Sequence, residues 1–244
     1  MSAGMPNLHP ELIALGFIWF IVFLFSTTCH EAAHALAAKL GGDPTAFHGG
    51  QVTLNPIPHM QREPFGMILV PVLSFLLTRG GWMMGWASAP YDPSWQRQHP
   101  RRAAWMSLAG PAANFTLMLL AGAAIRIGIA AGLFRAPAAV SFTNITEPVL
   151  AGGSSFAATF LSILFVLNLL LGTFNLIPVP PLDGSTGITV FMSEGRALRY
   201  LDWLREFNFG FLGLAIAWVA FDKIFDVVFR LALNLLYPGV HYGH

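Results

Sequence analysis

The sequence predicts an all-α polytopic membrane protein with about four to six transmembrane helices. Of its 244 residues, 55% are hydrophobic and only 10% are charged, whereas charged residues make up roughly 25% of an ordinary soluble domain. A helix of about 20 apolar residues is long enough to cross a bilayer. Apolar runs of this length lie at 11–36, 104–126, 156–177 and 208–236.

The chain is expected to form one membrane-embedded domain over 1–244, with its core at about 11–190 and a C-terminal helical region at 208–236. The first apolar run follows a segment without Lys or Arg and is too long for a cleaved signal sequence. We therefore expect a retained first transmembrane helix.

The segment between the first two spans predicts two irregular features. Phe47 to Leu54 is rich in β-prone residues and is bounded by glycine, which is typical of a short strand or β-hairpin. The following apolar stretch, at 65–87, is interrupted by Pro71 and by the Thr78–Gly81 break. These interruptions favour a re-entrant segment over a full crossing.

The charge and cysteine content exclude several classes of protein. The formal net charge is +1, and no Lys/Arg cluster is dense enough to neutralise a run of phosphates, so nucleic acid is not expected as a partner. Cys29 is the only cysteine, which excludes an intrachain disulfide and a Cys-rich structural zinc site. We expect Cys29 to be a small buried residue that fills space.

His30, Glu31 and His34 stand at the end of the first apolar run, in the sequence HEAAH. Ionisable residues in a membrane span are costly, so they indicate a functional site unless a helix end merely carries them to the interface. Residues four apart share one helix face, so His30 and His34 can bind one metal ion with Glu31 beside it. This HExxH pattern predicts two imidazole ligands for zinc and a neighbouring carboxylate base.

A catalytic zinc ion normally takes three protein ligands and leaves a fourth position for water. The best candidate for the third ligand is Asp183, in NLIPVPPLDG, which follows the third span. The prolines in this segment end the helix, and the unwound backbone is tolerable at membrane depth only where it lines a cavity walled by protein. The alternative is that Asp183 is simply a turn residue before Gly184.

With these residues in place, the sequence resembles the site-2 protease family of intramembrane zinc metalloproteases. HEAAH matches the HExxH of that family, NLIPVPPLDG matches NxxPxxxLDG, and AGPAAN at 109–114 is similar to its AGPxxN signature. VTLNPIPH is similar to a loop of some bacterial members, although 60–63 departs from the Asp-Pro type sequence that follows there. The chain resembles a minimal form, without PDZ or CBS domains.

The resemblance implies one zinc ion per chain, bound by His30, His34 and Asp183. It also implies Glu31 as the general base that assists attack by zinc-bound water and later protonates the leaving amine. Asn175 is the candidate donor to the oxyanion. Asn114 is a weaker candidate for the same role, and both asparagines could instead join helices by hydrogen bonds.

The predicted function is hydrolysis of a peptide bond in or near a transmembrane segment of another membrane protein, as in regulated intramembrane proteolysis. The expected partners are a single-span or other transmembrane substrate and the lipid bilayer. A helical substrate must unwind before it is attacked, and the strand-like segment at Phe47–Leu54 could receive the unwound peptide by strand addition.

Two other functions fit parts of the pattern. A metal-ion or proton transporter could use the His/Asp cluster as a permeation site, but it would not need Glu31 as a base. An inactive protease-like scaffold would not be expected to keep Glu31 and all three ligand positions. His48 and His59 could approach the site from the loop, and Asp222, Asp226 and Arg230 share a helix face that suggests an internal polar seam or ion pairs.

The position of the candidate ligands predicts the topology. The C-terminal ends of the first and third spans must meet at one depth, so these helices should run parallel, with the span at 104–126 between them and 65–87 re-entrant. One side of the membrane then carries most of the positive charge: Lys39, Arg62, Arg97, Arg101, Arg102, Arg196, Arg199 and Arg205, against Arg126 and Arg135. Because positive charge concentrates in the cytoplasm, we expect a multi-pass cell-membrane protein with an external N-terminus and its zinc site nearer the cytoplasmic side.

Overall fold

Three long helices form the body of the molecule. The computed structural model describes residues 10–150, 152–207, 210–240 and 242. Helices α1 (Pro10–Gly41), α6 (Pro100–Ala130) and α7 (Gly153–Asn175) stand side by side, and each is long and apolar enough to cross a membrane. The predicted all-α membrane fold is confirmed, with three such helices, or four if the bent α3–α4 pair counts as a span.

The three helices pack closely because bulky side chains of one meet small residues of another. Trp19 and Phe23 of α1 are buried in the same apolar core as Phe165 of α7. A side chain at Gly122 of α6 would press against the ring of Phe165, and one at Gly172 of α7 would press against Phe115. Apolar attraction is weak between helices in lipid, so this close contact is a main source of their association.

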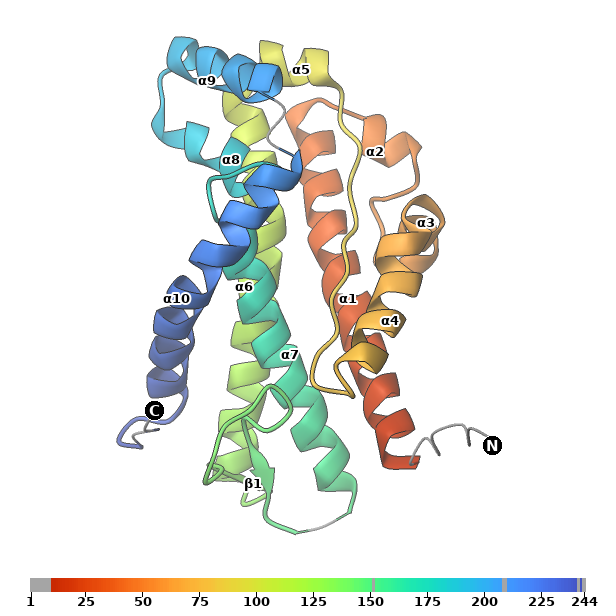
Figure 1. The fold of residues 1–244 in the computed structure, drawn as a ribbon, viewed down its shortest axis with the longest axis vertical. Coiled ribbons are helices and arrows are strands. Elements are labelled where there is room, and N and C mark those ends of the chain that lie inside the picture. The colour runs from red at the N-terminus through yellow and green to blue at the C-terminus, as the bar shows by residue number, and fades with distance from the viewer. Residues whose placement is uncertain (1–9, 151, 208–209, 241, 243–244) are drawn as a thin grey trace, which may run out of the picture.

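Helices α1 and α7 run parallel, and α6 runs in the opposite direction and packs against both (Figure 1). The C-terminal ends of α1 and α7 therefore point to the same end of the molecule, where α5 and α9 lie. A two-stranded antiparallel sheet, β1 (Phe134–Arg135) with β2 (Glu147–Pro148), lies at the other end. The expected parallel arrangement of the first and third spans is confirmed.

The predicted re-entrant segment is also present. Helix α3 (Pro56–Arg62) bends by 114° into the π-helix Phe65–Leu69 and α4 (Val70–Leu77). The chain then turns at 78–81 and returns as an extended segment, 82–92, to α5 (Pro93–Gln98), on the side from which it came (Figure 1). The segment enters and leaves at one end of the molecule.

The strand expected at Phe47–Leu54 is wrong. This region begins with the short helix α2 (Thr45–His48) and continues as a bend. The reason lies just before it, where the buried carboxylate of Asp43 accepts hydrogen bonds from the backbone and the side chain of Thr45. This side-chain turn leads directly into the helical turn of α2, which takes the place of the start of the expected strand.

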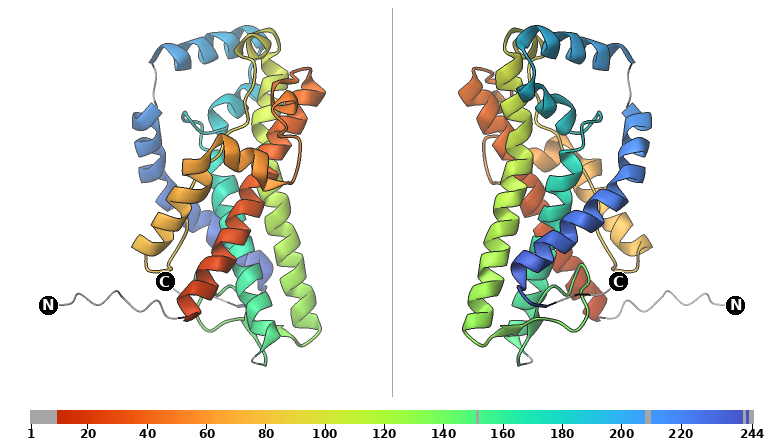
Figure 2. Two further views of the ribbon diagram at one scale, coloured as in Figure 1. Left: turned by 90° about the vertical axis from the view of Figure 1, so that its right-hand side faces the viewer. Right: turned by 90° about the vertical axis from the view of Figure 1, so that its left-hand side faces the viewer.

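The C-terminal part adds α8 (Gly184–Gly187), a 3₁₀ turn (Ile188–Phe191), α9 (Glu194–Phe207) and α10 (Gly210–Leu236). Figure 2 shows α10 running from the end that carries α9 towards the opposite end. The span expected at 208–236 is a helix from Gly210, but it is not among the candidate membrane spans. Residues 208 and 209 lie outside the described residues.

The charged residues of α10 do not form the internal seam that the sequence suggested. Arg230 and Asp226 make an ion pair of 2.6 Å, which confirms that alternative for these two residues. Asp222, Lys223 and Asp226, however, are exposed on the outside of the molecule.

Candidate metal centre

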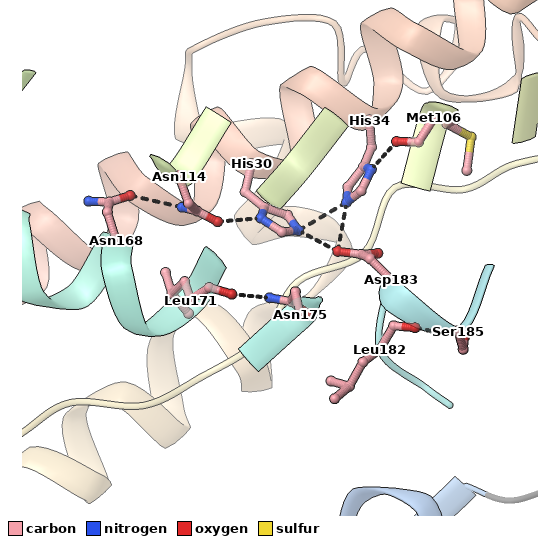
Figure 3. Close-up of polar contacts among 10 residues, drawn as sticks. All are labelled: His30, His34, Met106, Asn114, Asn168, Leu171, Asn175, Leu182, Asp183 and Ser185. Carbon is pink, nitrogen blue, oxygen red and sulfur yellow. Dashed lines mark hydrogen bonds and ion pairs between the residues drawn. The ribbon is translucent and has the colours of Figure 1, made fainter. Parts of the chain in front are cut away.

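Two imidazoles and one carboxylate meet where α1 passes the end of α7 (Figure 3). His30 and His34 are one helical turn apart on α1, and their Nε2 atoms are separated by 2.9 Å. Oδ2 of Asp183 lies 3.1 Å from Nε2 of His30 and 3.2 Å from Nε2 of His34. The structure thus brings Asp183 to two histidines that are 153 and 149 positions away in the sequence, as the HExxH and LDG motifs predicted.

Asp183 reaches this point because α7 ends early and the chain folds back tightly. After Asn175, Leu182 N donates to the carbonyl of Val179 at 3.0 Å, and the side chains of Ile177 and Leu182 are buried against Ala217 of α10. Gly184 lies so close to the carbonyl of Leu176 that no side chain would fit there. The segment that carries Asp183 is therefore held by α10 on one side and by the residues that follow α7 on the other.

The two imidazoles are oriented by hydrogen bonds at their far nitrogens. Nδ1 of His34 donates to the carbonyl of Met106 at 2.7 Å, and Nδ1 of His30 donates to Oδ1 of Asn114 at 2.6 Å. A proton on Nδ1 leaves the lone pair of Nε2 free, and a partner of this kind commonly fixes the tautomer of a metal-binding histidine. Both Nε2 atoms face Asp183.

Asn114 belongs to a buried chain of hydrogen bonds that joins all three long helices. Its Nδ2 donates to Oδ1 of Asn168 at 2.8 Å, and Nδ2 of Asn168 donates to Oγ of Ser26 and to the carbonyl of Leu164, both at 2.8 Å. Asn114, Asn168 and Ser26 are fully buried. Neither Asn168 nor Ser26 is among the residues that the sequence predicted for the site, although an Asn inside an apolar run and a Ser four residues before His30 are visible signals.

Gly110 of α6 allows the edges of the two imidazoles to approach the backbone of this helix closely. A Cβ atom at this position would overlap Nε2 of both His30 and His34. The structure thus gives a specific reason for the glycine of the AGPAAN motif at 109–114.

Glu31 is buried next to the cluster, only 5% exposed, and within the described part of the chain its carboxylate has no hydrogen-bond partner. Asn175 is half-buried, and its Nδ2 donates to the carbonyl of Leu171 at 3.0 Å, which leaves its second N–H uncommitted (Figure 3). These two residues lie beside the cluster rather than in it.

The remaining candidates make no contact with the cluster that the described residues record. His48 is exposed, with its ring beside that of Phe47. His59 is buried, but its Nε2 donates to the carbonyl of Thr53 at 3.1 Å. Cys29 is half-buried and therefore less enclosed than expected.

The donor set fits zinc. Two imidazole nitrogens and one carboxylate oxygen are common ligands of a catalytic zinc ion, which keeps its fourth position open. Atoms bound to a tetrahedral zinc at about 2.1 Å lie about 3.4 Å from one another, close to the observed separations of 2.9, 3.1 and 3.2 Å. A small shift of the side chains would admit the ion.

Comparison with known proteins decides the family. Residues 18–202, which include all three cluster residues, match the model of the family described as Peptidase family M50. The chain belongs to peptidase family M50. This confirms the resemblance to site-2 proteases, and the M50 protein is a multi-pass membrane zinc metalloprotease of that family.

Two curated relatives carry names of the same kind. The M50 protein is 30% identical over 227 residues to the "Putative zinc metalloprotease YwhC" of Bacillus subtilis (strain 168), an alignment that covers 89% of this chain and 92% of the relative. It is also 30% identical over 162 residues to the "Putative zinc metalloprotease Rip2" of Mycolicibacterium smegmatis, covering 66% of this chain and 52% of that protein. No solved structure matches the chain.

The hydrogen bond between His30 and Asn114 is expected to strengthen zinc binding. Asn114→Ala removes the acceptor that orients His30, so zinc affinity should fall by about 10- to 100-fold. His30→Ala, His34→Ala and Asp183→Ala should each lose the metal. The measurement is zinc content of the purified protein during titration with a chelator.

Thr116→Ala is the matched control, because Thr116 lies on the same helix, is exposed and bonds only the carbonyl of Ala112 of its own helix. It should bind zinc like the wild type. Unchanged zinc affinity in Asn114→Ala would contradict the assigned hydrogen bond to His30.

Proposed function

We propose that this M50 protein hydrolyses a peptide bond in or near a transmembrane segment of a membrane-protein substrate, in regulated intramembrane proteolysis. One zinc ion per chain is held by His30, His34 and Asp183. The observation that carries the proposal is the convergence of two oriented imidazoles and a carboxylate within 3.2 Å, between helices that are apolar enough to cross a membrane.

Zinc, when bound, activates water for attack and polarises the scissile carbonyl group. Glu31 accepts the proton of the attacking water and returns it to the leaving amine. Its carboxylate suits this role because it is buried beside the ligands and is bonded to no other described residue. Asn175, held by Leu171, offers its second N–H to the developing oxyanion, whereas Asn114 orients His30.

An apolar cavity favours this proposal over a transporter. A cavity of about 90 Å³ lies beside the end of α7, and Leu171 and Phe174, in the last turn of α7 before Asn175, form part of its wall. The other lining residues are mostly aromatic or aliphatic, including Trp19, Phe23 and Trp82. Such a space suits apolar side chains of a substrate, whereas an ion pathway needs polar groups along its length.

Glu31→Gln tests the mechanism directly. The variant keeps the three ligands, so it should bind zinc like the wild type, but it lacks the base and should lose at least about 10²-fold in cleavage rate. The measurements are metal content and cleavage of a panel of co-expressed single-span substrates. Normal cleavage by Glu31→Gln, together with zinc flux through vesicles that contain the wild type, would establish the transporter instead.

The extended segment 82–92 replaces 47–54 as the proposed receptor of the unwound substrate. Its even-numbered residues bond the re-entrant helices: Met84 N donates to Ser74 Oγ at 3.0 Å and Trp86 N to the carbonyl of Gly66 at 3.1 Å. Successive residues of an extended chain point their backbone groups to opposite sides. Among the described residues, the backbone groups of Met83, Gly85 and Ala87 have no partner, and Met83 and Gly85 line the cavity beside Phe174.

Ala87→Pro tests this receptor edge. Proline removes the N–H of residue 87 but accepts an extended backbone, so cleavage should fall while zinc content stays normal. Ala87→Val is the control, because valine favours the extended conformation and keeps the N–H. Equal cleavage by the two variants would contradict this proposal.

The distribution of charge supports a cytoplasmic position for the end that carries α5 and α9. Arg97 on α5 pairs with Asp202 on α9 at 3.3 Å, and Arg102 bonds the carbonyl of Gly41 at the end of α1, so these basic residues gather at one end. Since positive charge concentrates in the cytoplasm, the N-terminus is external. The zinc site, near the C-terminal end of α1, is closer to the cytoplasm.

Single cysteines in a Cys29→Ser background test this orientation. Leu40 and Gln98 are exposed at the α5 end, and Ala138 is exposed at the end that carries β1. With an impermeant thiol reagent on intact cells, Leu40→Cys and Gln98→Cys should react only after lysis, and Ala138→Cys should react before it. The opposite pattern would reverse the orientation, and different behaviour of Leu40→Cys and Gln98→Cys would contradict the re-entrant segment.

A further inference from the structure

Helix α10 presents a charged face to the outside of the molecule. Its inner face packs on the bundle through Ala217, Phe221 and Phe225. Its outer face combines exposed apolar side chains with the charged residues, at spacings of three and four that keep them on one side of a helix. The members of this outer face are Val219, Asp222, Lys223, Asp226, Val227 and Arg230.

This outer face lies at the depth of the middle of the bundle. Trp218 and Phe221 of α10 line the apolar cavity together with Phe23 from the middle of α1 and Val166 from the middle of α7. Asp222 and Lys223 follow directly after Phe221 in the helix. They are therefore level with the middle of the helices that can cross the membrane, rather than with either end of these helices.

Charged side chains at this depth are costly when they face lipid, and they normally face protein or a water-filled cavity. Asp226 is satisfied by Arg230 of the same helix, at 2.6 Å. Asp222 and Lys223 are different, because neither makes an ion pair or a side-chain hydrogen bond to any described residue. Neighbouring residues in a helix do not face each other, so these two cannot neutralise one another.

We propose that a second copy of this chain covers the outer face of α10, with Asp222 of each copy paired to Lys223 of the other. Both copies have the same orientation in the membrane, so a two-fold axis along the membrane normal brings residues of equal depth together. The face carries one acid and one base that no other described residue pairs, which makes it complementary to itself. Val219 and Val227 pack above and below the charges and exclude lipid from them.

Exchange of the two charges tests this pairing. Asp222→Lys places two bases against two bases, and Lys223→Asp places acids against acids, so each single variant should lose most of the dimer. The double variant Asp222→Lys/Lys223→Asp restores both pairs and should dimerise like the wild type. The measurement is the mass of the zinc-loaded full chain in nanodiscs, by light scattering, with zinc content as the check that each variant is folded.

Cross-linking in membranes gives an independent readout. In a Cys29→Ser background, Val219→Cys should form a disulfide-linked dimer on oxidation, whereas Leu120→Cys, on the exposed face of α6, should not. A monomeric wild type would overturn the proposal, as would a double variant that stays monomeric while retaining zinc. Cross-linking of Val219→Cys to another protein or to a substrate, without self-linking, would assign the face to that partner instead. None of these outcomes depends on proteolytic activity.

Discussion

The chain of buried hydrogen bonds from His30 through Asn114 and Asn168 to Ser26 is the constraint on which the rest of the structure depends. Polar groups at membrane depth must find partners inside the protein, because lipid offers none. Each member of this chain can be satisfied only if α1, α6 and α7 keep one relative register. That register also places Gly110 of α6 against the imidazoles and leaves both Nε2 atoms facing Asp183.

The position of Asp183, the third residue of the cluster, depends on α10 rather than on the three long helices. Gly213 of α10 lies so close to the carbonyl of Pro180 that no side chain would fit, and Ala217 packs on Ile177 and Leu182. The helix that supports the Asp183 segment is thus the helix whose outer face we assign to a second copy. Dimer formation would fix α10 on one side while the Asp183 segment and the cavity rest on the other, so the proposed interface and the metal centre share a structural support.

Hydrogen bonds at its two ends and close packing between them hold the re-entrant segment in place. The Asp43 carboxylate accepts the backbone N–H of Thr45 at the start of α2 and also that of Asp92, at 2.7 Å, so it joins the chain before the re-entrant segment to the chain after it. Between these points, the close approach of Gly66 to Trp86 and of Gly85 to Phe23 lets the extended return lie tightly between the re-entrant helices and α1. The result is an extended segment whose backbone groups on one side bond the re-entrant helices, while those on the other side bond no described residue.

Short-range patterns in the sequence determined much of this protein. Apolar runs gave the three long helices within a few residues, since bilayer thickness sets their length, and the i, i+4 spacing of His30 and His34 put two imidazoles on one face. The prolines after Asn175 predicted the unwound segment of Asp183. These features depend on neighbours in the chain, so the sequence alone contains them.

Only the tertiary structure decided which groups satisfy one another across helices. The acceptor of His34 is the backbone carbonyl of Met106, which no side-chain pattern can reveal. The role of Asn168, the overlap that makes Gly110 necessary, and the side of α10 that faces outward follow from the rotation and register of packed helices. The strand expected at Phe47–Leu54 is wrong for a related reason: the Asp43 carboxylate, which bonds Thr45 just before this region, also bonds Asp92, 49 residues away in the sequence. Such contacts depend on distances between segments that are remote in the chain, and a linear pattern does not specify those distances.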